Sequence, residues 1–357
     1  QPEITREAVF SAAGTSLDAM RTSGDRGQAV SAAAEGAANL VEAAFAAGKL
    51  SGVMGLGGSA GTTIATTAMQ RLPIGVPKVM VSTLASGQVR PYVGDKDVTM
   101  INSVVDIAGL NRVSRLVLGN AAAAMAGMVA NPTPSDTSDK PLIAATMFGV
   151  TTLCVDRARE VLEAAGYEVL VFHATGNGGQ AMESLIREGA VVGVLDVTTT
   201  ELADELVGGE LSAGPERLTA AARAGIPQVV SVGATDMVNF GPRDSVPEKF
   251  ADRHFFVHNQ TVTLMRTTAD ENEAIGREIG QKTSDSVGPT EVYLPAQGVS
   301  AIDATGQPFD DINARERLFQ AIRQTVGKTP CHTLDYHIND PQFAEAMATR
   351  LLQLIEK

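Results

Sequence analysis

The sequence predicts an α/β protein made of two Rossmann-like, doubly wound domains with mainly parallel sheets. Short runs of β-branched and other apolar residues, such as residues 78–83, are typical of strands buried on both faces. Segments with helical spacing separate these runs, and this alternation is typical of βαβ units. A polar segment with three prolines, residues 131–141, divides the chain, and 357 residues are enough for two domains.

The first expected domain covers residues 1–134. Its expected helices cover residues 4–21, 28–47, 62–71 and 112–129, and its expected strands cover residues 52–56, 78–83 and 98–103. The third of these helices ends before Pro73, which cannot continue a helix.

The second expected domain covers residues 141–357. Its expected strands cover residues 142–148, 168–173, 190–196, 228–232 and 291–294. Its expected helices cover residues 153–165, 180–188, 201–207, 215–224, 269–283, 314–325 and 341–356. Ligands of such folds bind at the carboxyl ends of strands, where loops meet helix N-termini.

Composition excludes several classes of function. The formal net charge is -13, which opposes binding to nucleic acid or to an anionic membrane. No run of 18 apolar residues and no basic-then-apolar leader is present, so we expect a cytoplasmic protein. Two cysteines cannot build a disulfide framework or a Cys-rich zinc site. His254 and His258 lie in a run that reads as a strand, so no metal site is expected there.

A glycine-rich segment follows the first expected strand and opens the next helix. Glycines allow close approach of a ligand to the backbone, and a helix N-terminus favours a phosphate or carboxylate. Hydroxyls can add hydrogen bonds. The residues expected to bind a nucleotide here are Gly55, Gly57, Gly58, Ser59, Gly61, Thr62 and Thr63. A tight turn without a ligand is the alternative.

Two other motifs overlap this segment. Gly55-x-Gly57-x-x-Ala60 satisfies a weak dinucleotide fingerprint, but the acid expected about 20 residues later is missing. No lysine follows Gly61 before Lys78, so the segment is not a P-loop. Gly57-x-Ser59-x-Gly61 also matches the nucleophile elbow of α/β-hydrolases. A serine hydrolase using Ser59, with a base and an orienting acid, is therefore an alternative function; its candidate partners are His332 or His337 with Asp303 or Asp310.

Polar residues follow the next two strands of the same domain. Ser86, Gly87 and Gln88 should lie beside the glycine segment in a parallel sheet, where they could hold phosphate or ribose, or simply form a capped turn. Asp106 is an acid among apolar neighbours. It could bind Mg²⁺ or a ribose, and a structural acid bonded to backbone is equally compatible with the sequence.

The second domain contains a similar glycine segment, which predicts a second ligand site. Its expected residues are Thr175, Gly176, Asn177, Gly178 and Gly179, with Asp196 at the fingerprint spacing for a ribose. This spacing makes a Rossmann dehydrogenase a further alternative. Equally, Thr198 and Glu201 match a capping box, which would make the region structural. His173 ends the preceding strand and is a candidate general acid or base, or a structural hydrogen-bonding residue.

Several blocks of the chain resemble one family. The matching blocks are residues 57–62, 72–78, 82–88, 102–106, 126–128, 172–183 and 258–268. This order of blocks is similar to that of bacterial and plant ATP-binding proteins related to the N-terminal part of the tomato protein that confers tobamovirus resistance.

The resemblance implies two Rossmann-like domains, ATP bound by the first domain, and a homodimer. It assigns nucleotide contact to Gly57, Gly58, Ser59, Gly61 and Thr62, and more loosely to residues 86–88. The family's usual first strand and Gly-Thr-x-Asp-Thr-Lys-Gly segment are not found here, so we expect the first domain to lack that part of the nucleotide-binding unit.

Together these features predict a protein that binds ATP and acts on or senses a small molecule in the interdomain cleft. If the protein is an enzyme, the second domain supplies the acid or base. A non-catalytic protein in which ATP shifts conformation or assembly is the alternative.

Overall fold

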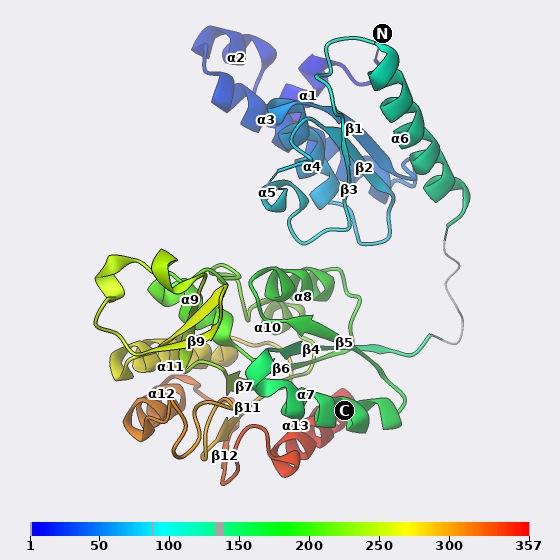
Figure 1. Cartoon of the computed structure of the whole chain (residues 1–357). Coiled ribbons are helices and arrows are strands. Elements are labelled where there is room, and N and C mark those ends of the chain that lie inside the picture. Colours follow the sequence, from blue (N-terminus) through cyan, green and yellow to red (C-terminus); the bar gives the residue numbers. More distant parts are fainter. Residues whose placement is uncertain (1, 88, 133–138, 357) are drawn as a thin grey trace. The chain divides into compact units, whose positions relative to one another are not determined.

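The chain divides into two units. The structure is a computed structural model that describes residues 2–87, 89–132 and 139–356 (Figure 1). The units comprise Gln1–Asp136 and Thr137–Lys357. Both are mixed α/β units with a parallel sheet, so the predicted fold class is confirmed.

The N-terminal unit has a small parallel sheet with strand order β1-β2-β3. The strands are β1 (Val53–Gly57), β2 (Lys78–Ser82) and β3 (Thr99–Asn102). The helices are α1 (Arg6–Ala12), α2 (Leu17–Ser23), α3 (Arg26–Ala46), α4 (Ser59–Gln70), α5 (Arg90–Val93) and α6 (Arg112–Ala130). All of β2 is buried, as expected for the central strand.

The helix predicted over residues 4–21 is instead two short helices. Gly14 has a positive φ of 72°, which ends α1, and the Ser16 side chain accepts from the Ala19 N–H to start α2. The sequence interpretation overlooked this stop and start because both segments have similar helical spacing.

Helix α6 covers one face of the small sheet. Its Val117, Leu118, Ala121 and Met125 pack with Val79 and Val81 of β2. Only Ser114 and Ala121 among its residues are buried, and Leu116 is 67% exposed. Among the described helices, α6 is the one whose length and apolar composition would allow it to cross a membrane.

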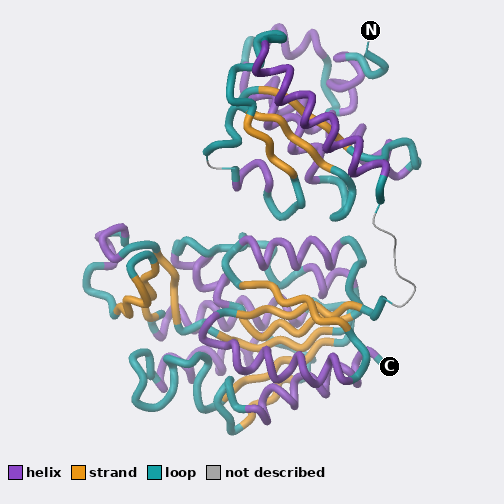
Figure 2. The backbone as a smooth tube through the Cα atoms, turned by 45° about the vertical axis from the view of Figure 1, so that its right-hand side comes forward, coloured by secondary structure: helices purple, strands orange, loops and turns teal. Residues whose placement is uncertain are grey.

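The C-terminal unit contains a six-stranded parallel sheet with order β12-β11-β7-β6-β4-β5. Figure 2 shows the strands of this unit lying between helices. Its strands are β4 (Leu142–Met147), β5 (Glu168–His173), β6 (Gly193–Thr198), β7 (Gln228–Gly233), β11 (Thr290–Pro295) and β12 (Cys331–Leu334). Because β5 and β6 lie on opposite sides of β4, the chain changes direction between β4 and β6. This switch point is where ligands commonly bind in open α/β sheets.

Helices cover both faces of this sheet. They are α7 (Thr152–Ala164), α8 (Asn177–Arg187), α9 (Thr200–Val207), α10 (Ala220–Ala224), α11 (Ala269–Ser284), α12 (Ile312–Thr325) and α13 (Pro341–Ile355). Helices α7 and α13 share one apolar core, and α11 and α12 share another.

A separate antiparallel sheet accompanies the parallel sheet of the C-terminal unit. It has order β8-β10-β9 and consists of β8 (Met237–Phe240), β9 (Phe255–Asn259) and β10 (Val262–Arg266). The sequence indicated a strand near residues 254–258 but not the sheet. Its Met237 and Leu264 pack with Ala234 and Phe309 beside the carboxyl end of β7.

Candidate functional site

The first glycine segment forms a very short connection between β1 and α4. Gly55 and Gly57 belong to β1, Gly58 is the N-cap of α4, and Ser59 is its first residue. The helix therefore begins three residues earlier than the sequence predicted, so most of the expected loop is strand or helix.

Three of the four glycines are explained by packing. A Cβ on Gly55 would lie 2.4 Å from the Ala65 Cβ, and a Cβ on Gly57 would lie 2.9 Å from the Gly61 Cα. A Cβ on Gly61 would lie 3.3 Å from the Leu56 carbonyl oxygen. These glycines let β1 and α4 approach each other closely, and buried Gly55 in particular is not placed to contact a ligand.

Gly58 differs from the other glycines of the segment. A Cβ there would meet only the Thr83 Oγ1, at 3.7 Å, which is an ordinary van der Waals contact. Its φ of -81° is open to any residue. The fold therefore does not require a glycine at this position, and close approach by a ligand is a reason to have one.

The first turn of α4 leaves main-chain donors available. Among the described residues, the N–H groups of Ser59, Ala60 and Gly61 have no hydrogen-bond acceptor outside the helix, and no side chain caps the helix. The first intrahelical bond in this turn runs from the Thr62 N–H to the Gly58 carbonyl, at 2.8 Å. Unpaired amides at the positive end of the helix dipole are suited to an anion.

The hydroxyl groups of the two threonines in this segment form hydrogen bonds within the protein. Thr62 is fully buried, and its Oγ1 contacts the Gly58 carbonyl and, at 2.7 Å, the Ser82 Oγ. The Thr63 hydroxyl donates to the Ser59 carbonyl at 3.0 Å. Thr62 was expected to contact a nucleotide through its hydroxyl. The structure corrects this, because that group instead links α4 to the end of β2.

A cavity of about 360 Å³ lies at the carboxyl ends of β2 and β3. Its lining residues are Thr83, Ser86, Asn102, Ser103, Val104, Val105 and Asp106. Thr83 is also the neighbour of Gly58, so the cavity adjoins the first turn of α4. Ser86 and Asp106 both line this cavity, Gly87 is exposed beside Ser86, and Gln88 lies outside the described residues. Nucleotide contact by these residues remains a prediction.

The described lining of the cavity consists of neutral polar residues, two valines and a single carboxylate. None of these described lining residues is basic. Lys78 is not available, because its ammonium group binds Asp97 and the Pro73 and Val76 carbonyls. Asp106 is exposed, and its Oδ1 accepts from the Ile107 N–H at 2.8 Å. Within the described residues no group of three His, Cys, Asp or Glu side chains could hold a metal ion without a ligand's help.

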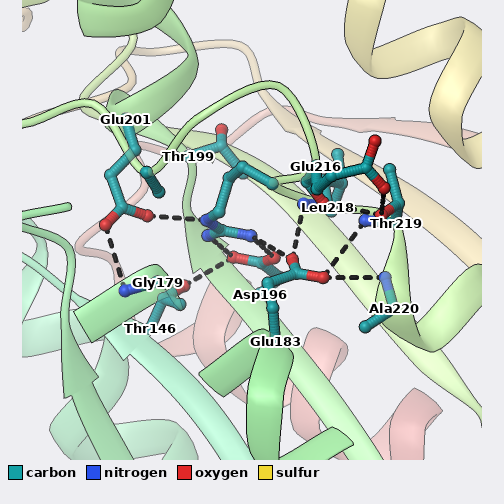
Figure 3. Close-up of polar contacts among 12 residues, drawn as sticks. Thr146, Gly179, Glu183, Asp196, Thr199, Glu201, Glu216, Leu218, Thr219 and Ala220 are labelled. Carbon is teal, nitrogen blue, oxygen red and sulfur yellow. Dashed lines mark hydrogen bonds and ion pairs between the residues drawn. The ribbon is translucent and has the colours of Figure 1, made fainter. Parts of the chain in front are cut away.

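The second glycine segment is arranged differently, because a carboxylate of the chain occupies it (Figure 3). The Glu201 Oε1 accepts from the Gly176 N–H at 2.7 Å. It also accepts from the Gly179 N–H at 3.1 Å, as Figure 3 shows. A Cβ on Gly179 would lie 2.2 Å from the Glu201 Oε2, and one on Gly178 would lie 1.9 Å from the His173 carbonyl oxygen. The glycines here serve the fold by admitting this internal carboxylate and a close backbone contact.

Arg217 is the centre of the same buried cluster. Its guanidinium group donates to the Glu201 Oε2 at 2.6 Å and to both Asp196 oxygens at 2.6 and 2.7 Å. It also forms an ion pair with Glu183, at 3.4 Å. The Arg217 side chain is 0% exposed, so the surrounding carboxylates neutralise a cation with no access to solvent. Burial is the main cause that raises the pKa of Glu201 above its ordinary value.

Asp196 is therefore a structural acid in this unit. It is 1% exposed, and its Oδ1 also accepts from the Thr146 hydroxyl at 2.7 Å. A ribose cannot reach an acid with this burial, so the geometry does not support the dinucleotide interpretation. The capping-box alternative is wrong as well, because α9 has no side-chain cap and Glu201 is directed to the glycine amides.

Glu183 caps the start of α10 in the same cluster. Its carboxylate accepts from the Leu218, Thr219 and Ala220 N–H groups. Leu218 has a positive φ of 68°, so the helix predicted over residues 215–224 is only Ala220–Ala224. No sequence pattern indicates that Arg217 and Glu183, 34 residues apart, form an ion pair.

The remaining residues of the second predicted site have local contacts or lie at the surface. Thr175 donates to the His173 carbonyl at 3.3 Å, and Asn177 is the exposed first residue of α8. The exposed His173 ring stacks on Phe148 at 5.3 Å between centroids. An acid–base function of His173 remains a prediction.

The partners proposed for Ser59 have other contacts. All five histidines belong to the C-terminal unit, so the N-terminal unit has no histidine base of its own. His332 binds Glu291 at 2.9 Å, and His337 bonds the Ser300 carbonyl at 2.8 Å. Asp303 is fully buried beside Arg315, and Asp310 forms an ion pair with the same arginine. These contacts give the hydrolase alternative no support.

The fold and these sites define a two-domain α/β protein. One Rossmann-like unit has an open helix N-terminus beside a polar cavity, and the other has a glycine turn filled by its own carboxylate.

The chain belongs to the uncharacterised protein family UPF0261. The N-terminal domain of this family matches residues 1–134 and its C-terminal domain matches residues 140–355. A UPF0261 protein of Clostridium tetani is 52% identical, over 100% of this chain and 89% of that protein. The ToMV resistance protein Tm-1(GCR237) of Solanum lycopersicum is 47% identical, over 86% of this chain and 42% of its own length. The family recognised from the sequence blocks is therefore confirmed.

Likeness to a solved structure is weaker. A thioesterase domain from the curacin biosynthetic pathway aligns with 60% of this chain and 92% of its own, at 12% identity and a TM-score of 0.29. A score this low carries no argument about fold or function.

Proposed function

We propose that the N-terminal unit binds a nucleotide, with phosphate at the first turn of α4 and the rest of the ligand toward the cavity at the ends of β2 and β3. The observation that carries the proposal is the set of available N–H groups at Ser59, Ala60 and Gly61 beside that cavity. ATP is the nucleotide that the sequence resemblance implies.

The polar groups that line the cavity are compatible with the phosphate and ribose oxygens of a nucleotide. Hydroxyl and amide groups of Thr83, Ser86 and Asn102 can bind phosphate or ribose oxygens without adding charge. Because no lysine or arginine is among the described lining residues, the main-chain amides must supply the positive potential. Mg²⁺, when bound with the nucleotide, would neutralise part of the phosphate charge, and Asp106 is the lining residue suited to hold it.

Gly58→Val provides the sharpest test of this proposal. A Cβ at residue 58 has room in the fold, so the valine should leave the unit folded while its branched side chain obstructs the amides. We expect ATP affinity, measured by calorimetry with and without Mg²⁺, to fall by at least about tenfold, or about 1.4 kcal/mol.

Gly119→Val is the matched control. Gly119 lies in α6, and a Cβ there has no atom within 4 Å, so its ATP affinity should equal that of the unchanged protein. Equal ATP affinity of Gly58→Val and the unchanged protein, or no binding by the unchanged protein, would reject the assignment.

A further inference from the structure

The turn after β3 contains a strained residue at the edge of the same cavity. Val104 has a φ of +64°, in the left-handed region that β-branched residues rarely occupy. The Val105 N–H donates to the Ser103 carbonyl at 2.7 Å across it. Residues 103–105 therefore form a γ-turn with a positive central φ, the rarer and more strained kind.

Tertiary packing does not explain this conformation. Among the described residues, three non-glycine residues have a positive φ: Val104, Leu218 and Ala234. Leu218 and Ala234 are 3% and 0% exposed, so the surrounding core holds them in place. The Val104 side chain is 68% exposed, and the turn is held by the Ser103–Val105 bond and by the Asn102 Oδ1, which accepts from the Val104 N–H at 3.0 Å.

The position of the turn relates it to the candidate site. Residues 102–106 contribute the β3 side of the cavity, while Thr83 and Ser86 contribute the β2 side next to Gly58. Residues held in sparsely populated backbone conformations cluster at active sites, ligand clamps and switch regions, where the strain is part of the mechanism. A ligand that enters the cavity would contact this turn directly.

We propose that the γ-turn at Val104 is strained in the free protein and relaxes when an anionic ligand occupies the cavity, so that release of the strain strengthens binding. This inference rests on the proposed function. It adds that residue 104 sets the affinity of the site through its backbone preference, although its side chain contributes no polar group.

Substitutions at residue 104 separate backbone preference from side-chain contact. Glycine and asparagine adopt a positive φ readily, whereas alanine retains much of the strain. In Val104→Gly and Val104→Asn the free protein is already relaxed. We therefore expect ATP affinity to fall about five- to thirtyfold, the equivalent of the strain of one left-handed residue. Val104→Ala should bind ATP within about threefold of the unchanged protein.

Stability provides the second readout. Urea unfolding should show that Val104→Asn stabilises the free protein, so that affinity and stability change in opposite directions. Ala234→Gly is the matched control, because it relaxes a positive φ in the C-terminal unit and should leave ATP affinity unchanged.

The outcomes distinguish this inference from the proposed function. If the unchanged protein binds no ATP, the proposed function fails and the inference fails with it. If the unchanged protein binds ATP but Val104→Gly and Val104→Asn bind it equally well or more tightly, only the inference is overturned. Loss of affinity in Val104→Ala equal to that of Val104→Gly would also overturn it, because side-chain contact would then explain the effect.

Discussion

Replacement of Arg217 by methionine should strongly destabilise the C-terminal unit. The substitution keeps a long, flexible side chain but removes the donors that reach Asp196, Glu201 and Glu183. All three carboxylates are at most 5% exposed, so water cannot replace the guanidinium group.

The expected loss of stability follows from the hydrogen bonds that each carboxylate retains. Glu201 retains two glycine amides and Glu183 retains three backbone amides, but Asp196 retains only the Thr146 hydroxyl among its contacts. Breaking a buried ion pair by removing one partner costs about 3–5 kcal/mol, which is a large part of the 5–15 kcal/mol of a typical domain. For a unit of this size the midpoint of thermal unfolding should fall by roughly 6–20 °C.

Urea unfolding followed by circular dichroism measures this loss. Arg223→Ala is the matched control, because Arg223 pairs with Glu216 on the surface, where both side chains are at least 60% exposed. Its loss should be below about 1 kcal/mol. The loss in Arg217→Met should also shrink at lower pH, since protonation neutralises the unpaired carboxylates. A change below 1 kcal/mol, or a loss that is the same at pH 5 and pH 8, would refute the assigned role of Arg217.

Two further predictions concern the same unit. Burial raises the pKa of Asp204 to about 7, so at pH 5 the folded state holds a proton that the unfolded state has lost. As the pH rises from 5 to 8 the folded state loses this proton too, and this carboxyl alone should lower the free energy of unfolding by roughly 2–3 kcal/mol. Urea titrations at the two pH values measure this change, Asp204→Asn should reduce it, and greater stability at pH 8 would contradict the prediction. Gly179→Ala should destabilise the unit by about 2 kcal/mol or more, because its Cβ would lie 2.2 Å from the Glu201 Oε2. Gly149→Ala, where a Cβ meets nothing within 4 Å, should be close to neutral in the same assay.

The two glycine segments show which features of the candidate sites could be predicted from the sequence. Both were recognised correctly as junctions between a strand and a helix, and both were predicted to bind a ligand. Only tertiary structure distinguishes them. The Glu201 carboxylate of α9 accepts hydrogen bonds from amides of the second segment, whereas no side chain caps the helix that begins at the first segment. Sequence spacing cannot reveal this, because Glu201 is 25 residues from Gly176 and approaches it only after the parallel strands have aligned.

Individual residues within the first segment were harder to assign. Glycine is equally compatible with a ligand and with close packing, so the sequence could not separate Gly55 from Gly58. The difference lies in the atoms that face each missing Cβ: the Ala65 Cβ at 2.4 Å in one case, and only the Thr83 Oγ1 at 3.7 Å in the other. Likewise Thr62 could not be recognised as buried until α4 was placed against β2.

The sequence by itself determined the alternation of strands and helices, the two-domain layout and the family, because short-range patterns of apolar residues, glycines and prolines encode them. Tertiary structure alone decided which glycine amides stay available, which acids surround Arg217 and where Val104 is strained. The first two features depend on contacts between residues distant in sequence, whose distances are fixed only when the sheets and helices pack. The Val104 turn is held by local hydrogen bonds from Val105 to Ser103 and from Val104 to Asn102, and the pattern of apolar residues does not reveal it.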